Sequence, residues 1–399
     1  MGSPGKHILI IVQNLPVPFD RRVWQEATTL KQAGFEVSVI CPKKKIYTKG
    51  FEVLEGVEIH RYPLVYEADS GVIGYFVEFI YCWFASFLLA AKAYIYKPFQ
   101  VIHACNPPDT FFALALLFRP FGVKFVFDHH DLSPEMFVAK GRSKKGLLYK
   151  GLILLERWTF KTADLVIAVN ESHKEIAIRR GKIPENKTVI VRSGPRSQWG
   201  QSTHADPPLK RGKKYLVMYL GEMCAQDGVD HLLYAIADFR NRYTDDTQFV
   251  FVGGGPDQQR LKLLASEMDL DNTVYFTGRI PDEELWIHLA TADVCVDPDP
   301  LTEWSNLSTM NKIMEYMAFG RPIVAFDLLE NRRSAMDAAI YVTPNKTDEM
   351  ASRIRQLIES EEERKVMSKL GRQRFESTLC WDYSAKVLVR AYTSLLLSQ

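Results

Sequence analysis

The sequence contains few cysteines, and their spacing fits neither a zinc site nor a disulfide framework. Six cysteines are distributed singly over 399 residues, and no Cys-x-x-Cys pair occurs. We therefore expect a reducing compartment. The first apolar strand, which follows residue 6, is too short for a signal peptide, so we expect a cytoplasmic protein.

Glycine is absent from the loop that follows this first strand. Residues 14–22 read NLPVPFDRR, whereas a dinucleotide-binding fold needs glycines at this point so that a pyrophosphate can approach the backbone. The Gly-Gly-Gly-Pro run at 253–256 follows a strand but lacks the rest of that fingerprint. A nicotinamide-dependent dehydrogenase is therefore disfavoured.

No charge of one sign dominates, since the net charge is +2. Residues 1–200 nevertheless carry 27 Lys and Arg against 18 Asp and Glu (+9), and residues 201–399 carry 23 against 30 (−7). We expect no nucleic-acid partner. Two basic clusters, Lys43-Lys44-Lys45 with Lys49 and the run at 140–145, fit either an anionic membrane surface or a solvated face.

The sequence has one long apolar run, residues 72–91. It is just long enough to span a bilayer, but a single crossing would place the strands before and after it on opposite sides of the membrane. A buried core helix and a helix that lies in the plane of the membrane surface are the two stronger interpretations. The second would make the protein peripheral on the inner face of the cytoplasmic membrane.

The length predicts two domains. Apolar strands alternate with helical stretches in both halves, a pattern typical of a parallel sheet covered by helices. We expect an α/β fold of two doubly wound, Rossmann-like domains, with a ligand cleft between them at the carboxyl ends of the strands. The predicted parts are a first domain at 6–195, a linker at 196–214, a second domain at 215–380, and a C-terminal helix at 381–399 that packs back on the first domain.

The most informative segment is residues 308–325, STMNKIMEYMAFGRPIVA. It predicts a helix that is capped by Ser308 or Thr309 and ended by Gly320, followed by a buried strand. The N–H groups at the start of such a helix suit an anion, and Glu315 can accept hydrogen bonds from a sugar diol. A nucleotide diphosphate presents both groups.

Four segments together resemble one family. They are NLPVPFDRRVWQEATTL, FDHHDLSPEMF, GRIPDEELW and STMNKIMEYMAFGRPIVAFDL, which are similar to bacterial family-4 retaining glycosyltransferases of GT-B architecture. The resemblance covers nearly the whole chain from Lys6. It implies a hexosyltransferase of polysaccharide biosynthesis that moves a sugar from a nucleotide-diphosphate sugar, with a UDP-sugar favoured, to a glycan or lipid-linked acceptor.

The resemblance also implies a mechanism. The family is described as using front-face substitution, in which the leaving phosphate takes the proton of the acceptor hydroxyl. No metal and no cofactor are expected. The first domain would then bind the acceptor and the second domain the nucleotide sugar.

Glu315 matches the second glutamate of the family's E-x7-E signature, whose carboxylate accepts the ribose hydroxyls. The first glutamate of the signature should fall at Leu307, so the signature is broken. Glu303 either substitutes for it or is a solvated loop residue. The backbone N–H groups of Leu307, Ser308 and Thr309 remain available for phosphate or sugar oxygens.

The residues that hold the diphosphate also depart from the family pattern. Many members use an arginine and a lysine where this chain has Glu222 and Asp227. Neither acid neutralises a phosphate, so we predict that Lys312, one turn into the helix, is the cation. A solvent-exposed Lys312 is the alternative.

Arg21 and Arg22 are the next candidates for the diphosphate. The alternative for this pair is an ion pair with Asp20 or Glu26, which lie close by in the sequence.

His130 matches a strand-end histidine that in the family faces the donor sugar, and Asp131 follows it as in the family's His-Asp pair. Adjacent histidines on an extended chain point in opposite directions, so only one of His129 and His130 can face a ligand. A structural turn histidine is the alternative. Asn106 is predicted either to line the acceptor side or simply to start a helix.

Arg279 resembles the position on which the nucleobase rests, and Gly254 completes the predicted donor-binding set. Asp297-Pro298-Asp299 imitates the metal-binding Asp-x-Asp of the other major glycosyltransferase fold, but its flanking prolines argue against a metal. Two other functions stay open: a nucleotide-sugar-binding subunit with impaired catalysis, and a GT-B sugar-nucleotide epimerase.

Overall fold

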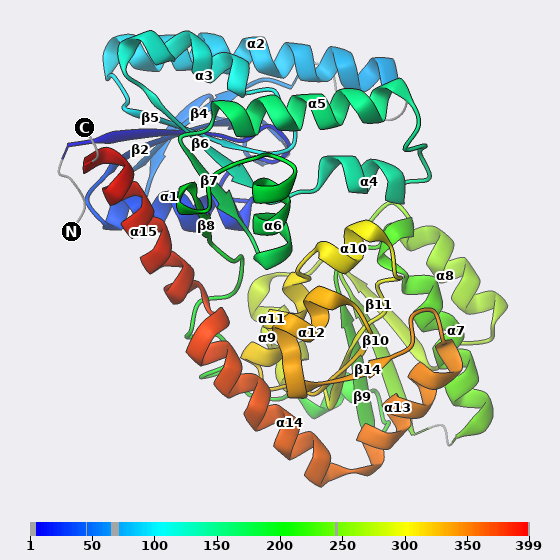
Figure 1. Ribbon diagram of the computed structural model, residues 1–399. Coiled ribbons are helices and arrows are strands. Elements are labelled where there is room, and N and C mark those ends of the chain that lie inside the picture. Colours follow the sequence, from blue (N-terminus) through cyan, green and yellow to red (C-terminus); the bar gives the residue numbers. More distant parts are fainter. Residues whose placement is uncertain (1–4, 45, 65–71, 244–245, 398–399) are drawn as a thin grey trace. The chain divides into compact units, whose positions relative to one another are not determined.

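The computed structural model describes residues 5–44, 46–64, 72–243 and 246–397, and it forms two compact units (Figure 1). Unit 1 comprises Met1–Ser193 and Ser384–Gln399, and unit 2 comprises Gly194–Tyr383. The chain therefore completes unit 1 only with its last residues. Lys45 of the first basic cluster lies outside the described residues.

Unit 1 is built on an eight-stranded sheet of order β3-β4-β2-β1-β5-β6-β7-β8. All strand pairs are parallel except β3 with β4. The strands are β1 (His7–Ile11), β2 (Glu36–Pro42), β3 (Phe51–Leu54), β4 (Val57–Tyr62), β5 (Val101–Cys105), β6 (Lys124–His129), β7 (Leu165–Ala168) and β8 (Thr188–Ile190). The helices are α1 (Arg21–Gln32), α2 (Val72–Tyr96), α3 (Phe112–Phe118), α4 (Ser133–Ala139), α5 (Leu147–Thr162), α6 (Glu171–Arg179) and α15 (Trp381–Leu397).

The two faces of this sheet differ because successive strand residues point to opposite sides. Ile102 and Phe127 belong to an apolar core that includes Cys82 of α2. The next residue along each strand, His103 and Asp128, points to the other face. Figure 1 shows α2, α3 and α5 along one face and α1 with α15 on the other. The buried groups His103 and Asp128 thus lie on the face opposite α2.

Unit 2 is built on a six-stranded, fully parallel sheet of order β11-β10-β9-β12-β13-β14. Its strands are β9 (Tyr215–Leu220), β10 (Thr247–Val252), β11 (Val274–Gly278), β12 (Val294–Asp297), β13 (Ile323–Phe326) and β14 (Ala339–Val342). Its helices are α7 (Val229–Arg242), α8 (Gln258–Glu267), α9 (Asp282–Thr291), α10 (Glu303–Leu307), α11 (Asn311–Ala318), α12 (Leu329–Ala335), α13 (Thr347–Glu359) and α14 (Glu361–Arg374).

Both faces of the unit 2 sheet are covered by apolar side chains. Val217 and Tyr219 of β9 belong to a core with residues of α7 and α13, whereas Leu216 and Met218 belong to a second core with residues of α9 and α11. The two doubly wound units confirm the predicted α/β fold class.

Residues 196–214, the predicted linker, lie inside unit 2. The ring of Trp199 packs 5.4 Å from the ring of Trp286 on α9, and the N–H of Asp206 donates to Thr291 Oγ1 at 2.8 Å. Apart from a short 3-10 helix at Pro207–Lys210 the segment has no regular element, which agrees with its lack of sequence periodicity.

Helix α15 carries one buried stripe at four-residue spacing, formed by Ser384, Leu388, Tyr392 and Leu396. Tyr392 Oη lies 2.5 Å from Nδ1 of His103, in the centre of the unit 1 sheet. The buried stripe of α15 therefore packs into unit 1.

Helix α2 is not the buried core helix that one interpretation expects. Its segment Phe76–Tyr96 is long and apolar enough to cross a membrane by length and composition, and 22% of the apolar window is buried. Cys82 and Ser86 are buried, but Phe84 and Leu88 are more than half exposed. The helix therefore covers the sheet with one side and exposes an apolar side.

Candidate functional site

The loops that follow β9, β10 and β11 pack backbone against backbone at the carboxyl edge of the unit 2 sheet. Met223 N–H donates to the carbonyl of Gly254, and Gly253 N–H donates to that of Gly278, each at 3.0 Å. Gly253 has φ +125°, and a Cβ atom there would lie 1.9 Å from the carbonyl oxygen of Gly221. Only glycine permits the two loops to approach this closely. Their backbone N–H and carbonyl groups therefore lie at the edge of the sheet.

Three residues of the predicted donor-binding set lie in these loops. A Cβ atom on Gly254 would be 4.0 Å from the amide nitrogen of Arg279, and the Arg279 side chain is exposed. Glu222 is exposed, and its carbonyl accepts a hydrogen bond from Tyr219 Oη at 2.7 Å. Asp227, which stands where the family has a lysine, accepts from the N–H of Cys224 at 2.8 Å and stabilises its own turn.

Helix α11 is fixed at the same edge by Tyr316. Its Oη accepts from the N–H of Leu220 in β9 at 2.8 Å and donates to the carbonyl of Val296 in β12 at 3.1 Å. Ile313 and Met317 are fully buried beside it. The first turn of α11 therefore lies at the ends of β9 and β12, where a parallel sheet places its ligands.

The start of α11 differs from the prediction. Its N-cap is Met310, without a side-chain hydrogen bond to the helix, so the predicted capping by Ser308 or Thr309 is wrong. Ser308 Oγ donates to the carbonyl of Trp304, because the short helix α10 precedes α11, and Thr309 Oγ1 donates to Glu330. The Ser308 hydroxyl therefore bonds at the end of α10, and the Thr309 hydroxyl bonds to α12. The spacing in the sequence predicts instead that one of them caps α11.

The other residues connected with the broken signature lie on α10 and α11 and differ in exposure. Leu307 ends α10 and is half-buried, and Glu303 begins α10 with an exposed side chain. Glu315 lies on α11 one turn after Asn311 and is half-buried.

Lys312 is buried between two carboxylates. Its Nζ lies 3.1 Å from Asp297 Oδ1, forms a second ion pair with Asp299, and lies 5.1 Å from the centre of the Tyr219 ring. Asn331 donates to the other oxygen of Asp297 at 2.7 Å. The Asp-Pro-Asp turn at the end of β12 thus holds an ammonium group.

The charges in this cluster balance. Burial acts to raise the pKa of Asp297, but Lys312 outweighs it and keeps that pKa below its ordinary value. Burial and the charge of Asp297 raise the pKa of Asp299 well above its ordinary value. Burial acts against the charge of Lys312, but the two carboxylates raise its pKa well above the usual value. The charge of Lys312 is thus compensated within the Asp-Pro-Asp turn.

This geometry corrects two predictions for Lys312. It is not a solvent-exposed lysine, since 8% of it is exposed, and its positive charge is compensated by Asp297 rather than available to a diphosphate. The sequence did contain a signal for this cluster. Two acids at a strand end precede a lysine in the first turn of the helix that crosses the strand.

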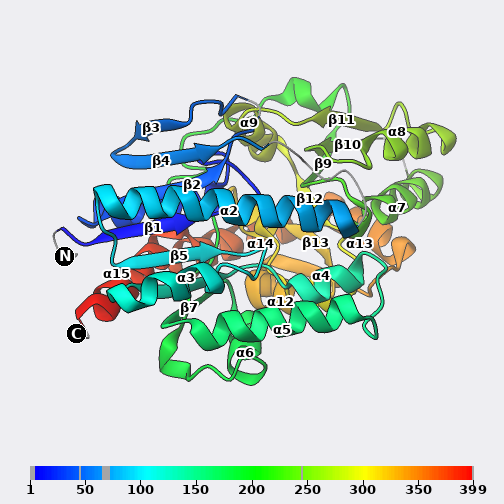
Figure 2. The ribbon, with the colours of Figure 1, turned by 90° about the horizontal axis from the view of Figure 1, so that it is seen from above.

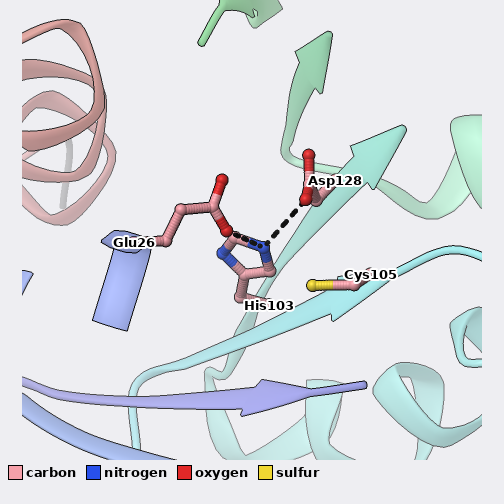
Figure 3. Close-up of side chains that lie close together, drawn as sticks. All are labelled: Glu26, His103, Cys105 and Asp128. Carbon is pink, nitrogen blue, oxygen red and sulfur yellow. Dashed lines mark ion pairs between the residues drawn. The ribbon is translucent and has the colours of Figure 1, made fainter. Parts of the chain in front are cut away.

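In unit 1, Asp128 near the end of β6 belongs to a buried cluster of ionisable groups, and Figure 3 shows it beside Glu26, His103 and Cys105. Arg22 binds its carboxylate with two nitrogens, Nε at 2.9 Å and Nη2 at 2.6 Å. His130 Nδ1 lies 3.0 Å from Asp128 Oδ2. Behind them, His103 Nε2 lies 3.4 Å from Glu26 and 3.9 Å from Asp128.

The cluster controls the protonation of His130. Burial acts to lower the pKa of His130, but Asp128 outweighs it and raises that pKa to about 9. Burial and the neighbouring charge of Asp128 raise the pKa of Glu26 to about 7. His130 is 14% exposed and therefore presents a charged imidazolium N–H at neutral pH.

Glu26, His103, Cys105 and Asp128 bring four possible metal-ligand atoms within 4.8 Å of one another. Arg22, however, places Nη2 within 3.1 Å of Glu26 and 2.6 Å of Asp128. A divalent cation at this point would face the guanidinium charge, so the residues do not fit a metal. This network of Glu26, His103 and Tyr392 was missed from the sequence because its members come from α1, β5 and α15.

Two predictions for unit 1 are corrected by burial. Arg22 is 8% exposed and bound to Asp128, so it is no candidate for the diphosphate, and the pairing alternative with Glu26 holds at 3.1 Å. Arg21 is exposed. Asn106 is 1% exposed, so its side chain does not line an acceptor site.

Asn106 instead shapes the turn that carries His130 and Asp131. Its Oδ1 accepts from both of their N–H groups at 3.0 Å, and its Nδ2 donates to the carbonyl of Asp131 at 2.7 Å. His129 points the other way, with Nε2 3.5 Å from Glu156, as the alternation along the strand predicts. The pair therefore separates into a buried His129 and a partly exposed His130.

Comparison with protein families matches almost the whole chain in two parts. Residues 20–194 match the glycosyl transferase 4-like domain, and residues 201–374 match the glycosyl transferases group 1. The chain belongs to the GT-B glycosyltransferases. The first model covers unit 1 from residue 20, after β1, and the second covers all six strands of the unit 2 sheet.

Curated relatives of this GT-B glycosyltransferase match over shorter lengths. An uncharacterized glycosyltransferase of Methanocaldococcus jannaschii is 23% identical over 59% of this chain and 60% of its own length. The alpha-D-kanosaminyltransferase of Streptomyces kanamyceticus is 30% identical over 38% of this chain and 39% of its own length. A GDP-mannose-dependent mannosyltransferase of Mycolicibacterium smegmatis is 38% identical over 22% of each chain. The chain thus spans 60% or less of the length of these relatives.

Solved structures match over the full length. Sucrose-phosphate synthase of Thermosynechococcus elongatus has a TM-score of 0.79 at 18% identity and covers 99% of this chain and 100% of its own. HepE of Anabaena in complex with UDP has a TM-score of 0.71 at 15% identity and covers 98% and 100%. At such identities the likeness establishes the shared GT-B fold.

Proposed function

We propose that this chain transfers a sugar from a nucleotide-diphosphate sugar to a hydroxyl group of a glycan or lipid-linked acceptor. The observation that carries the proposal is the glycine-built edge of unit 2, where Gly254, Arg279 and the first turn of α11 lie at the ends of the parallel strands. Backbone N–H groups at a helix start suit phosphate oxygens, and the half-buried Glu315 suits ribose hydroxyls.

UDP is the favoured nucleotide, and GDP is the main alternative. A fold neighbour binds UDP, whereas a shorter-matching relative depends on GDP-mannose. Since Lys312 is neutralised by Asp297, backbone N–H groups and the exposed Arg279 are the groups of unit 2 that we propose for the diphosphate. The compensated lysine still acts indirectly, because it fixes α11 against β12.

The proposed reaction is metal-independent front-face substitution with retention. The acceptor oxygen forms a bond to the anomeric carbon as the bond from that carbon to the diphosphate breaks, and the acceptor proton passes to the departing phosphate oxygen. The protein supplies electrostatic stabilisation of the leaving group rather than a base. We propose that the charged His130 donates a hydrogen bond to a substrate hydroxyl or carbonyl oxygen.

Binding of nucleotides to Glu315 variants tests the proposal. Titration of UDP and GDP by calorimetry should show that Glu315→Ala weakens binding at least about tenfold, which corresponds to about 1.4 kcal/mol. Glu303→Ala tests the substitute acid, and Glu362→Ala, an exposed helix glutamate of unit 2, is the matched control. Unchanged nucleotide affinity in Glu315→Ala would show that Glu315 of α11 does not contribute to the donor site.

A binding subunit with impaired catalysis is the second candidate, and the neutralised Lys312 favours it. Release of the nucleotide diphosphate in the presence of a panel of glycan and lipid-linked acceptors separates the two. Donor binding without release over the whole panel would support the binding subunit. Conversion of the donor sugar without any acceptor would instead indicate an epimerase.

A further inference from the structure

Helix α2 exposes many of its large apolar side chains, although others, such as Trp83, Phe87 and Leu89, pack partly against the core of unit 1. The residues that it buries are small or short: Cys82, Ser86, Ala90 and Ala93. The residues that it exposes by more than half are large and apolar: Phe76, Val77, Ile80, Phe84, Leu88, Ile95 and Tyr96. An amphipathic helix normally turns its large apolar residues to the core. Each large apolar side chain left in water forgoes about 1.5–3 kcal/mol.

This apolar surface continues across two neighbouring helices. Tyr94 of α2 packs 5.4 Å from Phe118 at the end of α3, and Phe112 of α3 packs 5.8 Å from Trp158 of α5. Figure 2 shows α2, α3 and α5 side by side on the same side of unit 1. The exposed apolar residues of α3, the turn after it, and α5 are Leu116, Leu117, Phe121, Leu147, Leu148, Leu154 and Trp158. Together with the exposed residues of α2 they form what we name the apolar platform.

The charges around the apolar platform have one sign. Among the described residues from 72 to 162, every exposed charged side chain is a lysine or an arginine. They are Lys92, Arg119, Lys140, Arg142, Lys144, Lys145, Lys150, Arg157 and Lys161. The acids of this range are buried or half-buried, including Glu78 of α2 and Glu156 of α5. The four basic residues at 140–145 directly precede Leu147, which is 86% exposed.

We propose that the apolar platform docks in the plane of an anionic lipid bilayer. An interfacial helix buries an apolar face at the level of the headgroups, and each nearby lysine or arginine adds about 1 kcal/mol of attraction to anionic lipids. The helix does not cross the bilayer, because Cys82 and Ala90 are packed in the core of the unit 1 sheet and Tyr81 Oη donates to the carbonyl of Pro63 at 2.6 Å.

Charge favours a bilayer over a second copy of the chain. A symmetric dimer through the apolar platform would bring the same basic residues of two copies together, which opposes association. An anionic bilayer complements both the apolar and the basic residues. The proposal is independent of the donor site in unit 2 and gives the proposed transferase direct access to a lipid-linked acceptor.

Flotation of the full chain with vesicles tests the proposal. Vesicles of phosphatidylcholine with phosphatidylglycerol should bind the wild-type protein, and phosphatidylcholine alone should bind it more weakly. Ile80→Ser with Leu88→Ser should abolish binding, and Lys144→Glu with Lys145→Glu should weaken it about tenfold or more. Because all four side chains are exposed, thermal unfolding and UDP binding should change little.

Matched changes in unit 2 are the controls. Leu263→Ser with Val366→Ser removes two exposed apolar side chains from α8 and α14, and Lys262→Glu with Lys369→Glu reverses two exposed charges. Both should bind vesicles as the wild type does. No binding at low salt, or equal loss in the control and platform variants, would overturn the proposal. A dimer in sedimentation that Ile80→Ser with Leu88→Ser dissociates, without lipid binding, would assign the platform to a second copy and also overturn it.

Discussion

At the scale of single residues, Lys312 gives the most direct test of the buried cluster in unit 2. Lys312→Met should remove the cation but leave Asp297 buried and charged. Loss of one partner of a buried ion pair costs about 3–5 kcal/mol, so we expect the free energy of unfolding to fall by that amount. Urea unfolding measures it, and Lys312→Met combined with Asp297→Asn should recover much of the loss. Unchanged stability of the single variant would mean that the ammonium group is not held by the acids.

His130 predicts a pH dependence of the stability of unit 1. Asp128 raises its pKa to about 9 from an ordinary value of 6.5, so the pair stabilises the folded state fully below pH 6.5 and less as the pH rises through 9. His130→Gln removes this contribution. The difference in unfolding free energy between wild type and variant should therefore decrease between pH 6.5 and pH 9. A difference that is constant over this interval would contradict the ion pair.

At this scale the sequence could not predict ion pairs between residues that lie far apart in the chain. The family resemblance proposes His130 and Glu315, which lie after the end of β6 and on α11, where local pattern determines position. The burial of Arg22 depends on Asp128, more than one hundred residues later, and that of Lys312 depends on how α11 crosses β12. The spacing of residues within a short segment reveals neither of these contacts.

At the scale of elements, the loops after β9 and β10 are limited by the space between their backbones. Gly253→Ala should place a Cβ atom against the carbonyl of Gly221 and also strain a positive φ. Overpacking costs about 1–3 kcal/mol and the strained backbone about 1–2 kcal/mol. Gly212→Ala is the control, because Gly212 has φ +81° but open space around it, so the substitution adds backbone strain without a close contact.

Urea unfolding and UDP titration of both glycine variants measure these effects. We expect Gly253→Ala to lose more stability than Gly212→Ala and to weaken UDP binding, because the loop that carries Gly254 must move. Equal losses in the two variants, with equal UDP affinity, would show that the close approach of the loops is unimportant.

Element boundaries near α11 were predicted less well than the element itself. Apolar spacing from Ile313 to Met317 correctly indicates the helix, but the short helix α10 uses Ser308 before α11 begins. The exposed face of α2 was also beyond the sequence, because aromatic residues surround the whole helix. Only the packing of Cys82 and Ala90 on the sheet determines which side faces out.

At the scale of the whole molecule, unit 1 is assembled from two segments separated by all of unit 2. The sequence predicts a C-terminal helix at 381–399 that packs back on the first domain, and in the structure Tyr392 of this helix contacts His103 of β5. Gly, Pro, Ser and charged residues without periodicity predict a linker at 196–214, and in the structure Trp199 and Asp206 of this segment contact α9.

This assembly predicts where a mutation in the last helix acts. Leu388 is fully buried in α15, so Leu388→Ala should cost about 2–5 kcal/mol through lost burial and a cavity. Because residues 384–399 belong to unit 1, amide hydrogen exchange should accelerate in β1 and β5 and change little in β9 and β12. Leu397→Ala makes the same chemical change at a position that is 68% exposed on the same helix, and it should leave exchange unaltered in both sheets. Faster exchange in the unit 2 strands alone would contradict the assignment of α15 to unit 1.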